Sequence, residues 1–359
     1  IMKTTIHQEP IGEMSDGRVI TAFTLSNEGG LRATFLNFGG VLIELEVPDR
    51  IGMPDDIVLG LDAIDDYVQR NSNYFGTLVG RFANRIAGGS FTLDGKKYQL
   101  PVYEEAAGVH LHGGTKGFSH QLFEGTVIDR DGDEALLLKY ESPDGEMGYP
   151  GNLELRVTLS LTADNGLRYE YEASTDAPTV INLTAHPYFN LAGQDAGTIR
   201  EHVLQIRADH YLPTDPETNT PRGKREPVDD SPFDFRQADS LDHRLDSPDP
   251  QVADNNGFDH TFVFPAERDL SEPVASVEDP ASGRCMTVYT SEPGVQLYTG
   301  NNLDGSFAGK GGCYYARHAG LCLETQHFPN SPNEPDFPST RLDPGKPYKS
   351  FTEYRFSAK

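Results

Sequence analysis

The stretch NLELRVTLSLTADNGLRYEYEAS, residues 152–174, has the pattern of two strands joined by a short turn. From Leu153 to Leu161 every second residue is Leu or Val and the residues between are polar or small, which is the period of a half-buried strand. RYEYEAS alternates again after the intervening ADNGL. Asn165-Gly166 supplies the positive φ values that a tight turn requires, so residues 152–174 are predicted to form a β-hairpin.

Similar alternation extends outward from this hairpin. Residues 18–47 predict a meander, and residues 127–142 predict another that turns at Asp131-Gly132. DRDGD (129–133) resembles a calcium-binding loop, but Tyr140 stands where such a loop needs a carboxylate, so we expect a plain turn. Only residues 61–71 have helical spacing, and the polar, proline-rich stretch 213–257 is expected to lie over one edge of the sheets.

The fold class follows from this count of strands over helices. Many short strands with turn signals between them favour an antiparallel sandwich or barrel. Large all-β folds can fill 359 residues as one domain. We therefore predict an all-β protein, a single large β-sandwich domain spanning residues 1–359.

The composition argues against several classes of partner and location. The formal net charge of -25 repels nucleic-acid phosphates and anionic lipid, so we expect no nucleic-acid and no membrane partner. The amino terminus lacks the apolar region of a secretory signal, and Ile1 is expected to be an addition ahead of Met2. The 3 cysteines (Cys285, Cys313 and Cys322) include no C-x-x-C pair, which favours a reducing, cytoplasmic location.

Four segments carry polar side chains where a plain β-protein would not place them. They are LVGRFANRIAGGSF (78–91, with Arg81, Asn84 and Arg85), GVHLHGGTKGF (108–118, with His110 and His112), TAHPYFNLAG (184–193, with His186) and HAGLCLETQHFPNSPN (318–333, with Glu324). Most have an ordinary structural explanation, since two alternating histidines without a third ligand are more often packing residues than a metal site. Glu324 differs, because a carboxylate in an apolar strand carries a desolvation cost unless it is paired or used.

Taken together, these segments resemble the aldose 1-epimerase family. The matching stretches are GRFANRIAGGSF (80–91), LHGGTKGF (111–118), TAHPYFNLAG, GFDHTFVF (257–264), EPGVQLYTGNNLDG (292–305) and GLCLETQHFPNSPNEPDFPS (320–339). The resemblance covers essentially the whole chain. It implies a large antiparallel β-supersandwich of the galactose mutarotase type, which uses no cofactor and no metal. The implied activity is interconversion of the α and β anomers of free hexoses such as galactose and glucose.

The chemistry of that reaction explains two of the residues. Mutarotation opens a cyclic hemiacetal by taking a proton from O1–H and delivering one to the ring oxygen O5, and then recloses it on the other face. The resemblance assigns the base to Glu324 and the acid to His186, with Pro187 helping to hold the direction of the imidazole. Burial alone would raise the pKa of Glu324 and lower that of His186, so we expect proximity and hydrogen bonds to oppose it.

The resemblance also implies a set of binding residues. Asp259 would accept hydrogen bonds from sugar hydroxyls, Arg85 and Asn84 would donate them, and Gln296 can do either. His112 would lie near the reacting end of the sugar, whereas His110 is expected to be a packing residue and the role of Arg81 is left open. With no tryptophan in the chain, Tyr188 or Phe189 could supply an apolar face, although core packing is expected for at least one of them.

Two alternatives to a mutarotase of free sugars stay open at this point. A hexose-6-phosphate 1-epimerase would need a basic cluster at the far end of the site, which the acidic composition disfavours. A non-catalytic sugar-binding protein on the same fold would not need a matched acid and base. The expected partner is a free aldose, and the expected assembly is a monomer or weak homodimer.

Overall fold

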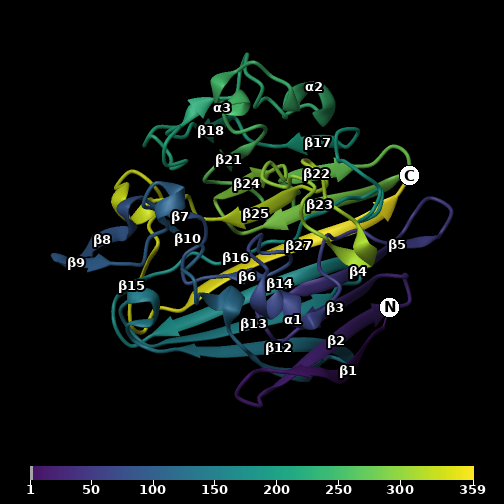
Figure 1. The fold of residues 1–359 in the computed structure, drawn as a ribbon, viewed down its shortest axis with the longest axis horizontal. Coiled ribbons are helices and arrows are strands. Elements are labelled where there is room, and N and C mark those ends of the chain that lie inside the picture. Colours follow the sequence, from purple (N-terminus) through teal and green to yellow (C-terminus); the bar gives the residue numbers. More distant parts are fainter. Residues whose placement is uncertain (1–2) are drawn as a thin grey trace.

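The structure, a computed structural model, describes residues 3–359, so the expectation about Ile1 and Met2 lies outside the described residues. Its largest element is a long antiparallel sheet, which runs across the centre of Figure 1. In spatial order its strands are β11 (Glu124–Arg130), β12 (Asp133–Ser142), β13 (Leu153–Leu161), β14 (Gly166–Thr175), β27 (Tyr348–Ala358), β23 (Arg284–Thr290), β22 (Ala275–Glu278), β17 (Val203–Ile206) and β20 (Asp239–Ser240). We call it the central sheet.

Two smaller antiparallel sheets form a second layer. The amino-terminal sheet has the order β1 (Thr4–Glu13), β2 (Val19–Asn27), β3 (Arg32–Leu36), β4 (Leu42–Pro48) and β5 (Pro54–Asp56). The site sheet, named for the pocket described below, has the order β19 (Glu226–Pro227), β18 (His210–Leu212), β21 (Asp259–Val263), β24 (Gly294–Tyr298) and β25 (Cys322–Gln326).

Short elements fill the space around these sheets. The two-stranded ladders pair β6 (Leu78–Val79) with β16 (Thr184–Ala185), β7 (Arg85–Ile86) with β10 (His110–Leu111), β8 (Ser90–Leu93) with β9 (Lys96–Gln99), and β15 (Thr179–Val180) with β26 (Arg341–Leu342). The α-helices are α1 (Ile64–Gln69), α2 (Leu241–Leu245) and α3 (Pro250–Ala253). The 3₁₀ turns are η1 (Ala87–Gly89), η2 (Glu104–Ala106), η3 (Phe118–His120), η4 (Glu146–Gly148), η5 (Lys310–Gly312) and η6 (Ser331–Asn333). No helix of the described residues is long and apolar enough to cross a membrane.

Both smaller sheets cover the same face of the central sheet. The ring of Phe35 in the amino-terminal sheet lies 6.0 Å from that of Tyr169 in β14. The hydroxyl of Thr325 in the site sheet lies 2.6 Å from that of Thr352 in β27. Tyr169 is directly opposite Thr352 in the β14–β27 ladder, so both side chains point to one face. The predicted large antiparallel β-sandwich is confirmed, with its apolar core between the two layers.

The predicted hairpin is confirmed as β13 and β14, but its turn differs from the prediction. Asn165 has the expected positive φ of 58°, whereas Gly166 is already the first residue of β14. The N–H of Thr162 donates to the carbonyl of Gly166, so Thr162 to Asn165 form a longer loop than the tight turn we expected. A Cβ at Gly166 would lie 2.5 Å from the carboxylate of Glu353 and 2.6 Å from the hydroxyl of Thr162, so a larger residue would displace these side chains.

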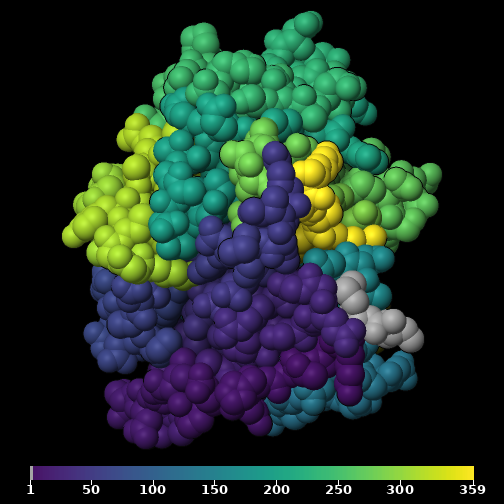
Figure 2. All heavy atoms as spheres, turned by 90° about the vertical axis from the view of Figure 1, so that its right-hand side faces the viewer, coloured from purple at the N-terminus to yellow at the C-terminus, as the bar shows by residue number. Residues whose placement is uncertain are grey.

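The other predicted meanders and the predicted helix are also present, with boundaries that differ by a few residues from those predicted. Residues 18–47 form β2 to β4, residues 127–142 fall in β11 and β12, and α1 lies within residues 61–71. The excursion 213–257 supplies β19 and β20, which are edge strands of the site sheet and the central sheet, together with α2 and α3. It covers the top edge of both layers, green in Figures 1 and 2, and buries Phe233 and Phe235 in the core.

Candidate active site

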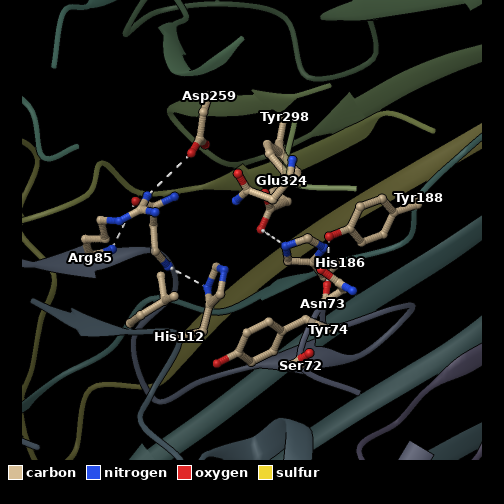
Figure 3. Close-up of a pocket in the computed structure, with 13 residues that line it drawn as sticks. Ser72, Asn73, Tyr74, Arg85, His112, His186, Tyr188, Asp259, Tyr298 and Glu324 are labelled. Carbon is tan, nitrogen blue, oxygen red and sulfur yellow. Dashed lines mark hydrogen bonds and ion pairs between the residues drawn. The ribbon is translucent and has the colours of Figure 1, made fainter. Parts of the chain in front are cut away.

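A polar pocket opens on the face of the site sheet that points away from the central sheet. It is an open pocket with about 490 Å³ of space between its walls, a volume that includes solvent at its mouth. Its lining includes Arg85, His112, His186, Asp259 and Glu324 (Figure 3). The structure therefore brings together residues that come from distant parts of the chain.

Glu324 reaches the pocket because strand geometry alternates its faces. In β25 the side chain of Thr325 points to the central sheet, so Glu324 points the opposite way, into the pocket. Its side chain is 2 % exposed, and its Oε1 atom has no hydrogen-bond partner among the described residues. An unpaired buried carboxylate oxygen is costly, which makes Glu324 unlike an ordinary structural glutamate.

His186 is held directly after β16, opposite Glu324. Its backbone N–H donates to the carbonyl of Thr77, and its own carbonyl accepts from the N–H of Gly76. The imidazole lies between the rings of Tyr74, 6.0 Å away and stacked, and Tyr188, 5.1 Å away. Its Nε2 atom lies 3.5 Å from Oε1 of Glu324, longer than the usual N–H···O distance of about 2.7–3.2 Å. The imidazole and the carboxyl group therefore face each other without a tight bond between them.

Burial sets the protonation of this pair. Desolvation raises the pKa of Glu324 well above its ordinary value, and the charge of Asp259 raises it further while Arg85 lowers it. Desolvation also lowers the pKa of His186 to about 4. Both shifts favour neutral side chains. The expectation that proximity and hydrogen bonds oppose the effect of burial on these two pKa values is therefore wrong. The physical reason is that neither group has a close charged partner. The contact between the two groups is the 3.5 Å separation of Nε2 and Oε1, which is too long for a strong hydrogen bond.

His112 lies beside the pair as a hydrogen-bond donor of fixed direction. Its Nδ1 atom accepts the N–H of Asn84 at 3.0 Å, and its own backbone N–H donates to the carbonyl of Asn84. Burial lowers the pKa of His112 well below its ordinary value, so the ring is neutral. With Nδ1 accepting, the proton of the neutral ring is on Nε2. The reciprocal pairing thus turns an N–H toward the pocket.

Neighbouring side chains hold the carboxylate of Asp259 in a fixed position. Its carboxylate accepts from Nε2 of Gln296 at 2.8 Å and from Nδ2 of Asn219 at 2.7 Å, and it lies 3.5 Å from Nη1 of Arg85. Gln296 also accepts from the hydroxyl of Thr261, and it lies behind Asp259 and is 2 % exposed. Asp259 is thus a fixed acceptor, and Gln296 supports it from below.

Comparison with known proteins shows the family of the chain. The family model described as aldose 1-epimerase matches residues 21–355. The chain is 42% identical over 348 residues to galactose mutarotase of Homo sapiens, covering 96% of this chain and 97% of that protein. It is 36% identical over 346 residues to aldose 1-epimerase of Escherichia coli, covering 96% and 97%. The chain belongs to the aldose 1-epimerase family.

Solved structures place the fold in the same family. The structure of galactose 1-epimerase from Lactobacillus acidophilus superposes with a TM-score of 0.85 at 27% identity, covering 100% of this chain and 99% of that chain. The aldose epimerase homologue from C. elegans superposes with a TM-score of 0.82 at 31% identity, covering 92% and 97%. The expected β-supersandwich of the galactose mutarotase type is confirmed.

Three other residues singled out in the sequence of this epimerase family member, His110, Arg81 and Phe189, lie outside the pocket. His110 is fully buried, with Nδ1 against the carbonyl of Pro101 at 2.6 Å and Nε2 against the hydroxyl of Tyr149 at 2.7 Å. Arg81 is also buried, and its guanidinium donates to backbone carbonyls that include those of Pro150 and Gly151. Both are structural. Phe189 packs in the core, while Tyr188 lines the pocket.

Tyr74 and Asn219 are among the residues of the site that carried no signal in the sequence. Tyr74 lines the pocket with a positive φ of 59°, and its ring lies 4.7 Å from that of His112 and stacks on His186. Asn219 comes from the excursion and reaches Asp259, which no local pattern indicates. For Tyr74, neither alternation nor a motif distinguishes it from its neighbours in NSNYFGTL (71–78).

A metal in this pocket is disfavoured by hydrogen bonding. His112, His186 and Glu324 place possible ligand atoms within 4.8 Å of one another, a geometry that could hold an ion. However, Nδ1 of His112 is occupied by the N–H of Asn84, so the nitrogen that faces the pocket carries the proton and has no free lone pair. The donor set fits a neutral, hydroxylated ligand better than a cation.

Proposed function

We propose that this protein is an aldose 1-epimerase, an isomerase that interconverts the α and β anomers of free hexoses such as galactose and glucose. The observation that carries the proposal is the buried pair of Glu324 and His186, whose Oε1 and Nε2 atoms lie 3.5 Å apart in the wall of a polar pocket. A carboxyl group and an imidazole in this position can remove and deliver a proton on one small molecule. The names of the relatives point to the same activity.

In this proposal the two groups share one proton throughout the reaction. The carboxylate of Glu324 takes the proton from O1–H, and Nε2–H of protonated His186 gives its proton to O5. The C1–O5 bond breaks and the aldehyde forms. The neutral carboxylic acid and neutral imidazole that result are the forms that burial favours. After rotation about C1–C2 the steps reverse, and the ring closes on the other face.

The rest of the pocket would bind and orient the ring. We assign Asp259 to accept from sugar hydroxyls, because its two supports and Arg85 hold it in place. Asn84 and Arg85 would donate to the sugar, and His112 would donate from Nε2 near the reacting end. Gln296 would act on the sugar chiefly through Asp259. No cofactor or metal takes part in this scheme, since proton transfer alone completes it.

The same residues bear on the alternatives. Among the described residues that line the pocket, Arg85 carries the permanent positive charge. This charge lies against the carboxylate of Asp259, so the pocket offers a sugar phosphate little unpaired positive charge. This favours a free sugar over a hexose 6-phosphate. A non-catalytic sugar-binding protein would leave Glu324 with an unpaired buried oxygen and no use for it.

We also propose a single domain over residues 1–359, a monomer or weak homodimer, a cytoplasmic location, and no nucleic-acid or membrane partner. The free thiols of Cys285, Cys313 and Cys322 support a reducing compartment. The continuous core between the central sheet and both smaller sheets supports one domain.

Polarimetry tests the function directly. Freshly dissolved α-D-glucose and α-D-galactose change optical rotation slowly as they equilibrate, and a catalyst speeds the change without altering its end point. We expect the protein to accelerate both, and glucose 6-phosphate poorly. A rate no greater than that of buffer for either free sugar would refute the proposal, and faster equilibration of the phosphate would favour the alternative epimerase.

A further inference from the structure

The strand that carries Glu324 lies at the edge of its sheet. β25 ends the strand order of the site sheet and pairs with β24. In an antiparallel ladder every second residue turns its backbone N–H and C=O groups away from the partner strand, and such groups need other partners when they are buried. For β25 and its flanking residues this outer edge includes Leu321, Thr325 and His327. Their partners show what holds the strand in place.

Two of these outer positions are joined to the segment that carries His186. Leu321 exchanges two backbone hydrogen bonds with Phe189, 2.7 and 2.9 Å long. The carbonyl of Thr325 accepts from the hydroxyl of Thr184 at 2.8 Å. The segment with His186 therefore lies along the outer edge of β25.

Asn182 closes the other end of this edge with its side chain. Its Nδ2 atom donates to the carbonyl of His327 at 3.0 Å, and its Oδ1 atom accepts the N–H of His327 at 2.9 Å. The amide thus offers the donor and the acceptor that the backbone of a neighbouring strand would offer. Among the described residues no backbone hydrogen bond joins residues 182–188 to residues 322–327, so side chains hold these two segments together.

The backbone of Asn182 is bonded to a third segment of the site. Its N–H donates to the carbonyl of Arg81 at 2.9 Å, and its carbonyl accepts the N–H of Ala83 at 2.7 Å. This segment leads directly into Asn84 and Arg85, which line the pocket. Asn182 itself is fully buried and is not among the residues that line the pocket. It therefore connects the segments that carry the pocket residues without reaching the pocket.

We propose that Asn182 is a positioning residue, which fixes the distance between the carboxyl group of Glu324 and the imidazole of His186. The inference rests on the proposed function, because only a proton transfer that uses both groups makes their separation matter. His186 follows Asn182 by four residues in the chain. Glu324 precedes His327 by three, so both side chains lie close in sequence to the two hydrogen bonds of the amide. Productive geometry requires reacting groups to be held within about 0.5 Å.

Polarimetry of Asn182→Ala tests this inference. The alanine leaves the N–H and the carbonyl of His327 without these partners, so the two segments can shift against each other. Displacing a reacting group by about 1 Å can cost about 100-fold in rate, so kcat for α-D-galactose should fall by about 10- to 100-fold. KM should change much less, because the variant keeps the backbone hydrogen bonds to Arg81 and Ala83, and with them the segment of the binding residues.

Two further variants separate positioning from stability. Asn37→Ala is the matched control, because Asn37 is also buried and its amide accepts from the N–H of Thr21 and donates to the carbonyl of Phe123, but it does not line the pocket. It should lower Tm and leave kcat of the folded protein unchanged. Thr184→Val removes the neighbouring hydrogen bond to β25 with little change in shape, so it carries the test if the alanine variant does not fold. It should lower kcat by a smaller factor.

Crystal structures of the parent protein and of Asn182→Ala, or of Thr184→Val in its place, give a readout that needs no activity. We expect the distance between Nε2 of His186 and Oε1 of Glu324 to differ by about 0.5–1 Å. An unchanged distance, or a kcat that falls no further than that of Asn37→Ala, would overturn the proposal. If the parent protein failed to accelerate mutarotation, the proposed function would be refuted, and the distance alone would decide this inference.

Discussion

Replacing Glu324 with glutamine tests the central assignment most directly. The change keeps the size of the side chain and its ability to hydrogen-bond, and it removes the proton acceptor. Glu324 is buried and its Oε1 atom has no hydrogen-bond partner among the described residues, so the substitution breaks no bond at that atom. Loss of turnover without loss of stability is therefore the expected pattern.

The size of the kinetic effect follows from the role of a general base. One positioned acid or base typically contributes about 10²–10⁴ in rate. At about 1.4 kcal/mol for each tenfold, this corresponds to roughly 3–5 kcal/mol of transition-state stabilisation. We expect kcat of Glu324→Gln, measured by polarimetry or by a coupled assay specific for one anomer, to fall by that factor. KM should change little, because Asp259 and Arg85 still bind the ring.

The stability effect has the opposite sign from that of a structural glutamate. Desolvation raises the pKa of Glu324, so the ionised side chain is less stable in the folded protein than in water. Neutral glutamine avoids that penalty, and Tm should stay the same or rise. Glu353→Gln is the matched control. Its carboxylate is also buried but accepts from Thr162, Arg168 and Arg355, which hold its pKa below the ordinary value.

The control should show the reverse result. Removing a charge-assisted hydrogen bond of about 1.5–3 kcal/mol should lower the Tm of Glu353→Gln by several degrees and leave kcat near that of the parent protein. If Glu324→Gln kept its turnover, or if it lost stability as Glu353→Gln does while the folded fraction stayed fully active, Glu324 would not be the base.

Other predictions follow from the same site. Asp259→Ala should raise KM by at least tenfold with a smaller effect on kcat. Asn219→Ala should raise KM by less, because it removes one hydrogen bond that holds Asp259 in place. A fall in kcat as large as the rise in KM would contradict a binding role for Asp259. The pH profile of kcat/KM should fall on the acid side as His186 takes up a second proton near its pKa of about 4, and on the alkaline side as the pair loses its last proton from Glu324. Arg85→Ala removes a charge that lowers the pKa of Glu324, so it should move the alkaline limb to higher pH, and a shift to lower pH would refute this. Dialysis against EDTA should leave the polarimetric rate unchanged, whereas loss of activity restored by zinc would contradict the metal-free scheme.

Alternation along the chain was sufficient to predict the sandwich. The period of two in residues 153–161 appears in the structure as a strand whose Leu and Val side chains are buried and whose charged residues are exposed. The details of the turn could not be predicted from the sequence, because they depend on side chains that are distant in the sequence. A Cβ at Gly166 would lie 2.5 Å from the carboxylate of Glu353, which is far away in sequence, and no local pattern contains that neighbour.

The site was predictable where chemistry and position were both unusual. Glu324 stood out because a carboxylate in an apolar strand requires an explanation, and strand alternation then directs it into the pocket. Gln296 pairs directly with Glu324 across the sheet, but its side chain is used to hold Asp259, which only the three-dimensional register shows. Asn219 could not have been found, since the excursion that carries it has no periodic pattern that fixes its path back to the pocket.

The hydrogen bonding of the site distinguishes the groups that we propose to bind the sugar from the groups that we propose to react. Asp259 is held by donors from Gln296 and Asn219, which fixes its direction before a sugar arrives. Glu324 and His186 instead face each other at 3.5 Å with no tight bond between them. A direct ion pair here would be worth about 1.5–3 kcal/mol, and a sugar would have to break it to place O1 and O5 against the two groups. In the proposed reaction the ionised pair and the neutral pair hold the same number of protons, and burial favours the neutral forms that follow ring opening. The proton can therefore pass between the pair and the sugar in either direction, which a reaction that forms both anomers requires.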